Sequence, residues 1–471
     1  MSDLQTPVIA GQRLRRKVRS VPAADARAFL AAAHGEVRGY WGRGDRWVAW
    51  AGELARVQVG PGGKNPSRFT VVRDQAETLG RKLFGDAVSD GRKERPRFFG
   101  GFSFLDGGPH DPTWDGFSRA CFILPRTTLR STPGEALLTH WVPGEAAQGQ
   151  APGGGDLLPV STGSEGRGEG PQASIAGSLN GDSMAELARR ARSAAPADQA
   201  RWSEAVQAVL EAISRGEVEK AVLARILDLE ISQGLTGGDP MLALERLRRE
   251  NPRAHVFLFE PEPGRIFMGA APEILTELRG RRFQATAVAG SISRGDSEAK
   301  DRVLARQLLE SDKDLQEHRL TAVEMSEVLA PRLASMVVGE EPRVLRLARI
   351  QHLETVIRGM ARPEEDVLSL VEALHPTPAV CGRPRERALE LIRDAEPFDR
   401  GWYAGPVGWF DGAGDGDFVP AIRSAVGGGS SWRLFAGAGI VPGSLPQAEW
   451  EETALKFEPA LRALVDGLQE S

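Results

Sequence analysis

The C-terminal stretch Leu434-Phe-Ala-Gly-Ala-Gly-Ile-Val-Pro-Gly-Ser444, continued by Gln447-Ala-Glu-Trp-Glu-Glu-Thr-Ala-Leu-Lys456, joins a glycine-rich turn to an acidic segment. Ser444 and Gln447 have the spacing of a capping box, and the apolar residues that follow recur at helical intervals, so we predict a helix here. Glu449, Glu452 and Lys456 then share one face of that helix, close to the backbone N–H groups of the turn. Such a face can hold a hard cation together with an anionic ligand. The alternative is a solvated face with ordinary surface ion pairs.

The composition describes an ordinary globular protein and excludes several functional classes. The chain has 471 residues, a net charge of −5 and 41% hydrophobic residues, which is enough to bury a sizeable core. Lys and Arg are scattered among acidic residues, so we expect no nucleic-acid partner. The two cysteines, Cys121 and Cys381, lack CxxC spacing, which argues against a zinc site and a disulfide framework. The chain shows no signal pattern and no run of about 18 apolar residues, so we expect a cytoplasmic protein without a membrane segment.

One break in composition divides the chain. Residues 144–175 are rich in Gly, Pro and Ser and predict a flexible loop or linker. Residues 1–143 contain short aromatic and β-branched runs that predict antiparallel strands, at Arg46–Trp50, Arg97–Phe104 and Ala120–Pro125. In residues 176–471, strand and helix patterns alternate. They predict a helix from Glu204, a strand from Lys220 and long amphipathic helices at 298–330 and 364–375. The fold class is therefore α/β.

Two residues in this second part are candidates for proton transfer. Alternation along the strand from Lys220 places its side chain on a face that is at least half buried. Burial favours the neutral amine, which can take a proton from water; an exposed edge-strand lysine is the alternative. Glu273 follows a strand and a small-residue turn, from which its carboxyl can project into a cleft as a general acid. Its alternative role is to complement the dipole at the start of a helix.

Further polar residues suggest a metal and an anion site. Glu317 lies in a predicted helix and can share a metal with Glu452, for which Mg²⁺ is suited because it takes few protein carboxylates. A solvated helix face is again the alternative. The segment from Asp399 to Ser424 resembles a hairpin whose second strand presents Arg423, which can form a fork with a carboxylate. His352 stands in Gln-His-Leu-Glu-Thr without HExxH spacing, so zinc is disfavoured.

Taken together and in this order, the motifs resemble those of the chorismate-utilising enzymes, in particular isochorismate synthases. The matching blocks cover about residues 200 to 460. They are the Lys220 strand, Gly269 to Glu273, Val288-Ala-Gly-Ser, Lys313 to His318, Gln351-His-Leu-Glu-Thr, His375-Pro-Thr-Pro-Ala-Val-Cys-Gly, Trp402-Tyr-Ala-Gly-Pro-Val-Gly, Ala421-Ile-Arg and Ala436 to Lys456. The resemblance implies one α/β unit of two antiparallel β-sheets packed face to face with helices outside. The strands of residues 1–143 would belong to the same unit.

The resemblance also implies the chemistry. The substrate would be chorismate and the cofactor Mg²⁺, with Glu317 and Glu452 as metal ligands and Glu449 nearby. Lys220 would take a proton from water as it attacks C2, while Glu273 protonates the departing C4 hydroxyl. The remaining residues implied for the pocket would bind or surround the substrate: Gly290, His352, Tyr403, Arg423, Gly437 and Lys456. The resemblance implies no definite role for His352.

Residue choices within the family favour one branch. Relatives that add ammonia generally carry glutamine where this chain has Lys220, and aminodeoxychorismate synthases commonly carry lysine where it has Ala289. We therefore expect water as the nucleophile and no amidotransferase subunit. Salicylate synthases share the lysine and are the alternative enzyme. The expected pathway is menaquinone synthesis, with a catecholate siderophore as the alternative.

Overall fold

The computed structural model describes residues 14–22, 24–60, 62, 66–85, 95–143, 196–231 and 239–465. Its strands all pair antiparallel, and they form two arms that meet at β5 (Ala120–Thr132). The predicted linker, 144–175, lies outside the described residues. None of the described helices has the length and apolar character needed to cross a membrane.

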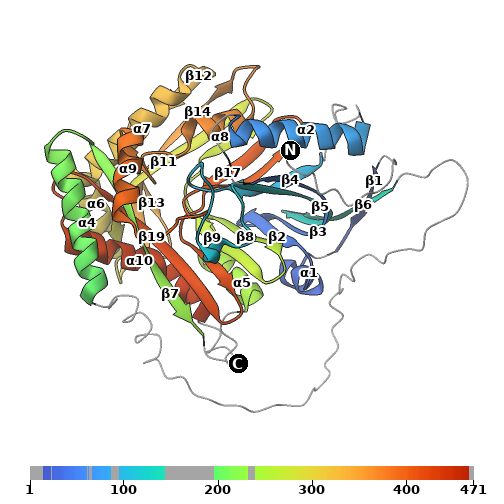
Figure 1. Ribbon diagram of the computed structural model, residues 1–471, viewed down its shortest axis with the longest axis horizontal. Helices are drawn as coiled ribbons and strands as arrows, with labels where there is room; N and C mark the ends of the chain where they lie inside the picture. The colour runs from blue at the N-terminus through green and yellow to red at the C-terminus, as the bar shows by residue number, and fades with distance from the viewer. Residues whose placement is uncertain are drawn as a thin grey trace, which may run out of the picture.

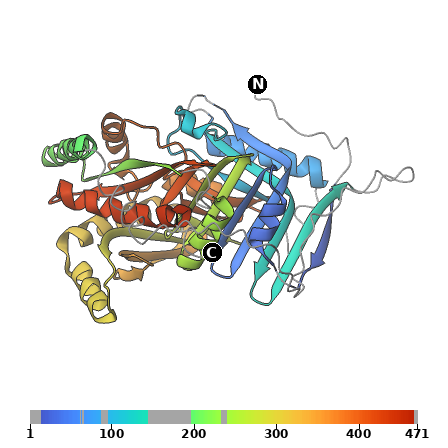
Figure 2. The same ribbon diagram turned by 90° about the horizontal axis from the view of Figure 1, so that it is seen from below.

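The first arm runs from β1 to β15 through pairings that join both ends of the sequence (Figures 1 and 2). Strand β2 pairs with β8, so strands from before and after the undescribed segment share one sheet. In spatial order the arm comprises β1 (Leu14–Ser20), β6 (Glu135–Pro143), β5, β3 (Arg46–Val59), β2 (Arg38–Arg43), β8 (His255–Glu262), β9 (Arg265–Ala271), β18 (Ser424–Gly428), β19 (Ser431–Ile440), β7 (Lys220–Glu230) and β15 (Gly382–Arg383).

The second arm leaves β5 through β4 (Arg97–Phe102). It continues through β16 (Pro406–Asp411), β17 (Gly416–Pro420), β10 (Thr276–Arg279), β11 (Arg282–Ser293) and β14 (Ile350–Ala361), with β12 (Leu333–Val338) and β13 (Arg343–Arg346) on the far edge. The prediction of two facing antiparallel sheets is confirmed. The structure adds that the two sheets are continuous through β5.

Apolar side chains fill the space between the arms and cover their outer faces. The central core joins Trp50, Phe257 and Phe267 of the first arm to Phe99 and Trp409 of the second. On the outside, α1 (Ala26–Ala32), α5 (Pro240–Glu250) and α10 (Pro446–Val465) cover the first arm. Helices α2 (Arg68–Phe84), α7 (Asp312–Leu329) and α8 (Val367–Leu374) cover the second. Figure 1 shows α2 and α8 on the opposite side of the strands from α1 and α5.

Three further α-helices and one 3₁₀ helix complete the described part: α4 (Pro196–Ser214), α6 (Glu298–Glu310), α9 (Arg385–Ala395) and η2 (Pro112–Trp114). The prediction of a single helix at 298–330 is wrong. The chain is extended at Ser311, whose hydroxyl accepts the N–H of Asp314 at the start of α7.

The capping box predicted for Ser444 and Gln447 is also wrong. Ser444 Oγ accepts the N–H of Val441, and α10 begins at Pro446, whose missing N–H suits a first helical position.

Replacing Phe122 by Ala should remove one of the central ring contacts of the second arm. Phe122 on β5 is fully buried, with ring centroids 5.0 Å from Phe102 and 5.1 Å from Phe410. We expect a loss of about 3–5 kcal/mol in the free energy of unfolding, measured by guanidinium titration. The control is Val337→Ala on β12, where the side chain is 70% exposed. Equal midpoints for the two variants would contradict this account of the core.

Candidate functional site

The predicted site residues gather around one pocket, which has about 660 Å³ of empty space including the part open to solvent. Eight of them line it: Glu273, Gly290, Glu317, His352, Tyr403, Arg423, Gly437 and Lys456. Lys220 and Glu452 are ion-paired with lining residues, and Glu449 lies one helical turn before Glu452, whose charge raises the pKa of Glu449. The pocket thus draws on β7, β11, β14, β19, α7 and α10.

Lys220 is fully buried at the start of β7, as strand alternation predicted. Its Nζ lies 3.1 Å from Glu317 Oε1 and 3.4 Å from Thr321 Oγ1, both on α7. Burial acts to raise the pKa of Glu317, but the charges of Lys220 and Lys456 outweigh burial and bring this pKa below its usual value. Gly439 makes the contact possible, because a Cβ at that position would lie 2.2 Å from Glu317 Oε1. A lining carboxylate of the pocket is therefore paired with a fully buried lysine.

Glu273 follows the end of β9 by two residues and is 1% exposed. Burial raises its pKa to about 8, with the charge of Lys220 acting in the opposite direction. Its Oε1 has no hydrogen-bond partner among the residues that the structure describes. The carboxyl is therefore protonated at neutral pH and lines the pocket with an unsatisfied polar atom. The alternative role at the start of a helix is wrong, because no helix begins here.

Arg423 and His352 form a buried pair on the pocket wall. Arg423 Nη2 contacts His352 Nε2, and His352 Nδ1 is 3.1 Å from the carbonyl oxygen of Gly290. The carbonyl can only accept, so Nδ1 carries the proton and Nε2 accepts from Arg423. Burial, then the charges of Arg423 and Lys456, hold the pKa of His352 well below its usual value, so the ring is neutral. Arg423 lies past β17 at φ 54°, and not within the second hairpin strand as predicted.

Gly290 sits at an irregularity of the β11–β14 pairing with φ 73°, a conformation that favours glycine. The next N–H, that of Ser291, donates to Asp314 Oδ1 at 3.2 Å. On the opposite side, Lys456 Nζ donates to the Gly437 carbonyl at 3.0 Å. Tyr403 stacks on Phe435 with centroids 5.0 Å apart and closes the pocket there.

The three predicted metal ligands are each paired with a lysine. Glu317 contacts Lys220, Glu452 contacts Lys456 at 2.6 Å, and Glu449 contacts Lys313. Burial, then the charge of Glu452, raises the pKa of Glu449 to about 7, which shows that two carboxylates crowd each other here. Within the described ranges no three His, Cys, Asp or Glu side chains form a ready metal site. The donors are all oxygens, and their crowding would be relieved by a hard divalent cation, so this set fits Mg²⁺.

Sequence reasoning missed several residues of the site. Lys313, the partner of Glu449, stands in a recognised block but received no role. Thr321 lies one helical turn after Glu317, and that i,i+4 spacing was a usable signal. Ser291 and Asp314 meet only because the strand irregularity and the start of α7 lie together, which local sequence does not reveal.

Comparison with known proteins identifies the family of the chain. The family model described as "Chorismate binding enzyme" matches residues 9–465, so the chain belongs to the chorismate-binding enzymes. The predicted family is thereby confirmed. "Isochorismate synthase MenF" of Bacillus subtilis (strain 168) is 34% identical over 406 residues, covering 85% of this chain and 82% of that protein. "Salicylate biosynthesis isochorismate synthase" of Pseudomonas aeruginosa is 35% identical over 416 residues, covering 87% and 82%.

Solved structures show the same fold. MenF, the menaquinone-specific isochorismate synthase from Escherichia coli, aligns with a TM-score of 0.72 at 25% identity, over 97% of this chain and 95% of that one. The structure of a 2,3-dihydroxybenzoate-specific isochorismate synthase, DhbC from Bacillus anthracis, described as putative in its title, aligns with a TM-score of 0.69 at 27% identity. It covers 93% of this chain and 99% of that one.

Proposed function

We propose that this protein is an isochorismate synthase, which adds water at C2 of chorismate, releases the C4 hydroxyl and shifts the double bonds. The observation that carries the proposal is the protonated carboxyl of Glu273, with its unsatisfied Oε1, in a pocket whose lining residue Glu317 lies 3.1 Å from the buried amine of Lys220. The reaction needs one acid and one base acting on a single substrate. The relatives named above support the same reaction.

Glu273 acts as the acid. Its pKa of about 8 keeps the proton on the carboxyl at neutral pH, and burial makes that proton available only to a group inside the pocket. When the C4 hydroxyl leaves, it takes this proton and departs as water. Lys220 in its neutral form takes a proton from the attacking water, so that one water is consumed and one is released; a divalent cation on Glu317 would favour this form by replacing the ammonium as partner of the carboxylate. Thr321 and Glu317 fix the position of the amine for this step.

Cationic side chains bind the carboxylates of chorismate. Burial lowers the pKa of Arg423 only to about 10, so the guanidinium stays charged at neutral pH. His352 orients it by accepting one N–H and, being neutral, adds no charge that would repel the cation. This gives His352 the role that the sequence left unassigned. Lys456 supplies a second positive charge from α10.

We propose Mg²⁺ as the cofactor, held by Glu317, Glu452 and Glu449. When bound, the ion would supply fixed positive charge for the substrate carboxylates. The crowding of Glu449 and Glu452 supports this assignment. We also propose menaquinone synthesis as the pathway, with support from the B. subtilis and E. coli MenF relatives.

The direct test incubates the protein with chorismate and Mg²⁺, with and without ammonium, and separates the products by chromatography. We expect isochorismate alone from the unchanged protein and from the control Lys300→Ala, whose side chain is exposed on α6. Lys220→Ala should lose turnover by about 10²–10⁴-fold while retaining chorismate binding, because the base acts on water. Salicylate with pyruvate would indicate a salicylate synthase, and an aminated product or an active Lys220→Ala variant would refute the proposal.

The pH dependence should report Glu273. Because the carboxyl must be protonated to donate, kcat/KM should fall above about pH 8, by tenfold per pH unit once Glu273 is mostly ionised. The free energy of unfolding should also fall with rising pH. Because the pKa is raised from 4.5 to about 8 in the folded protein, this contribution is fully present below about pH 4.5 and is lost as pH rises from there to about 8. Steady-state rates from pH 6 to 9.5 measure the effect, with circular dichroism as the control for unfolding. A flat profile would remove Glu273 from this role.

The Mg²⁺ requirement should depend on Glu452. Glu452→Gln removes one anionic oxygen, so the Mg²⁺ concentration at half-maximal rate should rise about tenfold or more. Tryptophan fluorescence during Mg²⁺ titration gives a second readout that does not depend on turnover. The matched control is Glu451→Gln, the neighbouring exposed carboxylate that bonds to Gln447. Identical titrations for the two variants would contradict the metal role.

A further inference from the structure

Strand β7, which carries the proposed base, has a long partner strand on one edge and a short one on the other. On the first edge, β19 pairs with β7 from Ala221 onwards. On the second edge, β15 pairs with the first two residues of β7 and no further among the described residues. The N–H of Val222 still donates to the carbonyl oxygen of Cys381 at 2.7 Å, just before β15. Beyond this bond, the Val222 carbonyl and the Ala224 N–H need other partners.

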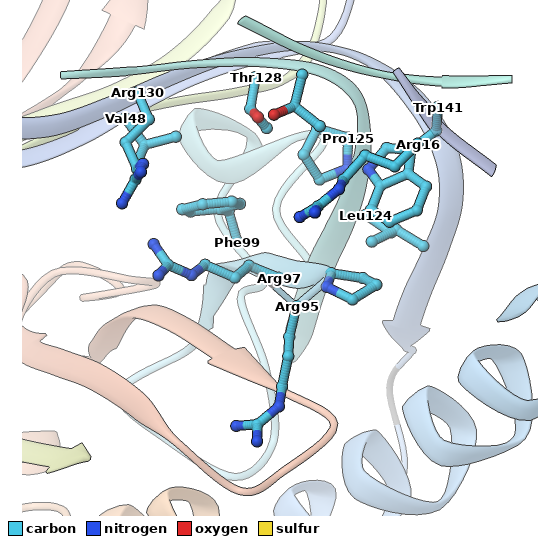
Figure 3. Close-up of a pocket in the computed structure, with 12 residues that line it drawn as sticks. Arg16, Val48, Arg95, Arg97, Phe99, Leu124, Pro125, Thr128, Arg130 and Trp141 are labelled. Carbon is cyan, nitrogen blue, oxygen red and sulfur yellow. The ribbon is translucent and has the colours of Figure 1, made fainter. Parts of the chain in front are cut away.

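A strand edge that changes partner can leave an open space. Strand β5 shows this case, because its residues Ala120–Ile123 pair with β4 and its residues Thr127–Thr132 pair with β6. A pocket with about 510 Å³ of empty space, including the part open to solvent, lies beside this change of partner (Figure 3). Leu124 and Pro125, which stand between the two paired segments, line it. At β7, by contrast, two side chains occupy the position that a partner strand would take.

These side chains are those of Arg400 and Glu396, which follow α9. Arg400 Nη2 donates to the Val222 carbonyl at 2.7 Å, and Glu396 Oε1 accepts the N–H of Ala224 at 2.7 Å. The same Nη2 and Oε1 are 2.5 Å apart, and Arg400 Nε donates to Glu396 Oε2 at 2.8 Å. The pair therefore offers β7 one donor and one acceptor, as a neighbouring strand would.

The same pair is bonded to the wall of the candidate active site. Arg400 Nη1 donates to the carbonyl oxygen of Val380 at 2.8 Å, and the carbonyl oxygen of Arg400 accepts the N–H of Tyr403 at 2.8 Å. Val222, Val380 and Tyr403 all line the pocket. Arg400 thus connects lining residues from β7, from the segment before β15 and from the turn before β16.

Burial makes these contacts specific. The side chains of Arg400 and Glu396 are 3% and 4% exposed. Burial acts to lower the pKa of Arg400, but the charge of Glu396 outweighs it, so the guanidinium stays charged. An apolar pair of similar volume can fill such a space without loss of stability. It cannot bond to the backbone of Val222, Ala224 and Val380, however, so these bonds are what the ion pair adds.

We propose that Arg400 and Glu396 are positioning residues for the proposed reaction, and that they act by closing the edge of β7. Lys220 lies two residues before Val222 on the same face of the strand. A shift of the backbone at Val222 therefore moves the amine relative to a substrate in the pocket. The inference rests on the proposed function, because the position of this amine affects a rate only if the amine acts in the reaction.

The test uses two variants that keep each charge and alter its reach, Arg400→Lys and Glu396→Asp. A lysine lacks the planar set of donors that serves two carbonyls and a carboxylate together. We expect kcat for chorismate with Mg²⁺ to fall about 10–100-fold per folded molecule in each variant, as for a small misplacement of a reacting group. KM should stay within about threefold, because the proposed carboxylate-binding cations, Arg423 and Lys456, come from other segments.

The matched controls are Arg38→Lys and Glu260→Asp. Arg38 and Glu260 also form a buried ion pair, with both side chains 3% exposed and 2.5 Å between Arg38 Nε and Glu260 Oε2. This pair joins β2 to β8, and neither residue lines the candidate active site. The controls should lower the melting temperature about as much as the test variants do, and should leave kcat within about twofold.

Hydrogen exchange gives a readout that does not depend on any reaction. Amide exchange over residues 220–226, followed by mass spectrometry, should become faster in Arg400→Lys and Glu396→Asp and stay unchanged in the controls. Unchanged exchange in the test variants, or an equal fall in kcat in the controls, would overturn the positioning role. A product other than isochorismate from the unchanged protein would instead refute the proposed function, and the exchange rates would still decide whether the pair closes β7.

Discussion

The buried ion pair between Lys220 and Glu317 is the contact on which the geometry of the candidate active site depends. It joins the first strand of the catalytic region to a helix that covers the opposite arm, at a separation of 3.1 Å. An isolated charge at zero exposure would cost several kcal/mol, so each partner is stable there only because the other is present. Gly439 leaves the space for the carboxylate, and Thr321 supplies the next contact of the amine. The pair thus fixes where β7, β19 and α7 meet.

Around this pair, burial determines which side chains of the pocket are charged and which are neutral. Arg423 stays cationic in spite of burial, whereas His352 beside it is neutral and can accept its N–H. Glu273 is buried, its Oε1 has no hydrogen-bond partner among the described residues, and its carboxyl keeps its proton. The same physical effect therefore yields a proton donor at one wall and a fixed cation at another.

Local sequence was sufficient for some of these features and insufficient for others. Strand alternation placed Lys220 in the interior, and a strand followed by small residues placed Glu273 at the pocket, because both depend on neighbours within a few positions. The two facing sheets followed only from the family resemblance. Their junction at β5 rests on pairings such as Phe99 with Ile123 and Thr128 with Thr139, which no local pattern specifies. The break at Ser311 was missed because a single capping serine inside an amphipathic pattern does not interrupt its periodicity.

The branching of β5 explains why one chain carries two such different pockets. Two arms can face each other across a common core only if the sheet divides, and it divides where one edge of β5 changes partner from β4 to β6. Side chains of the diverging strands spread apart at that point, so the space between them stays open, and the arginines on three of those strands line it. At the other end of the arms, β7, β11 and β19 converge with α7 and α10, and the space is enclosed by buried polar groups. Divergence leaves the arginine-lined pocket and convergence leaves the candidate active site, so both follow from the same topology.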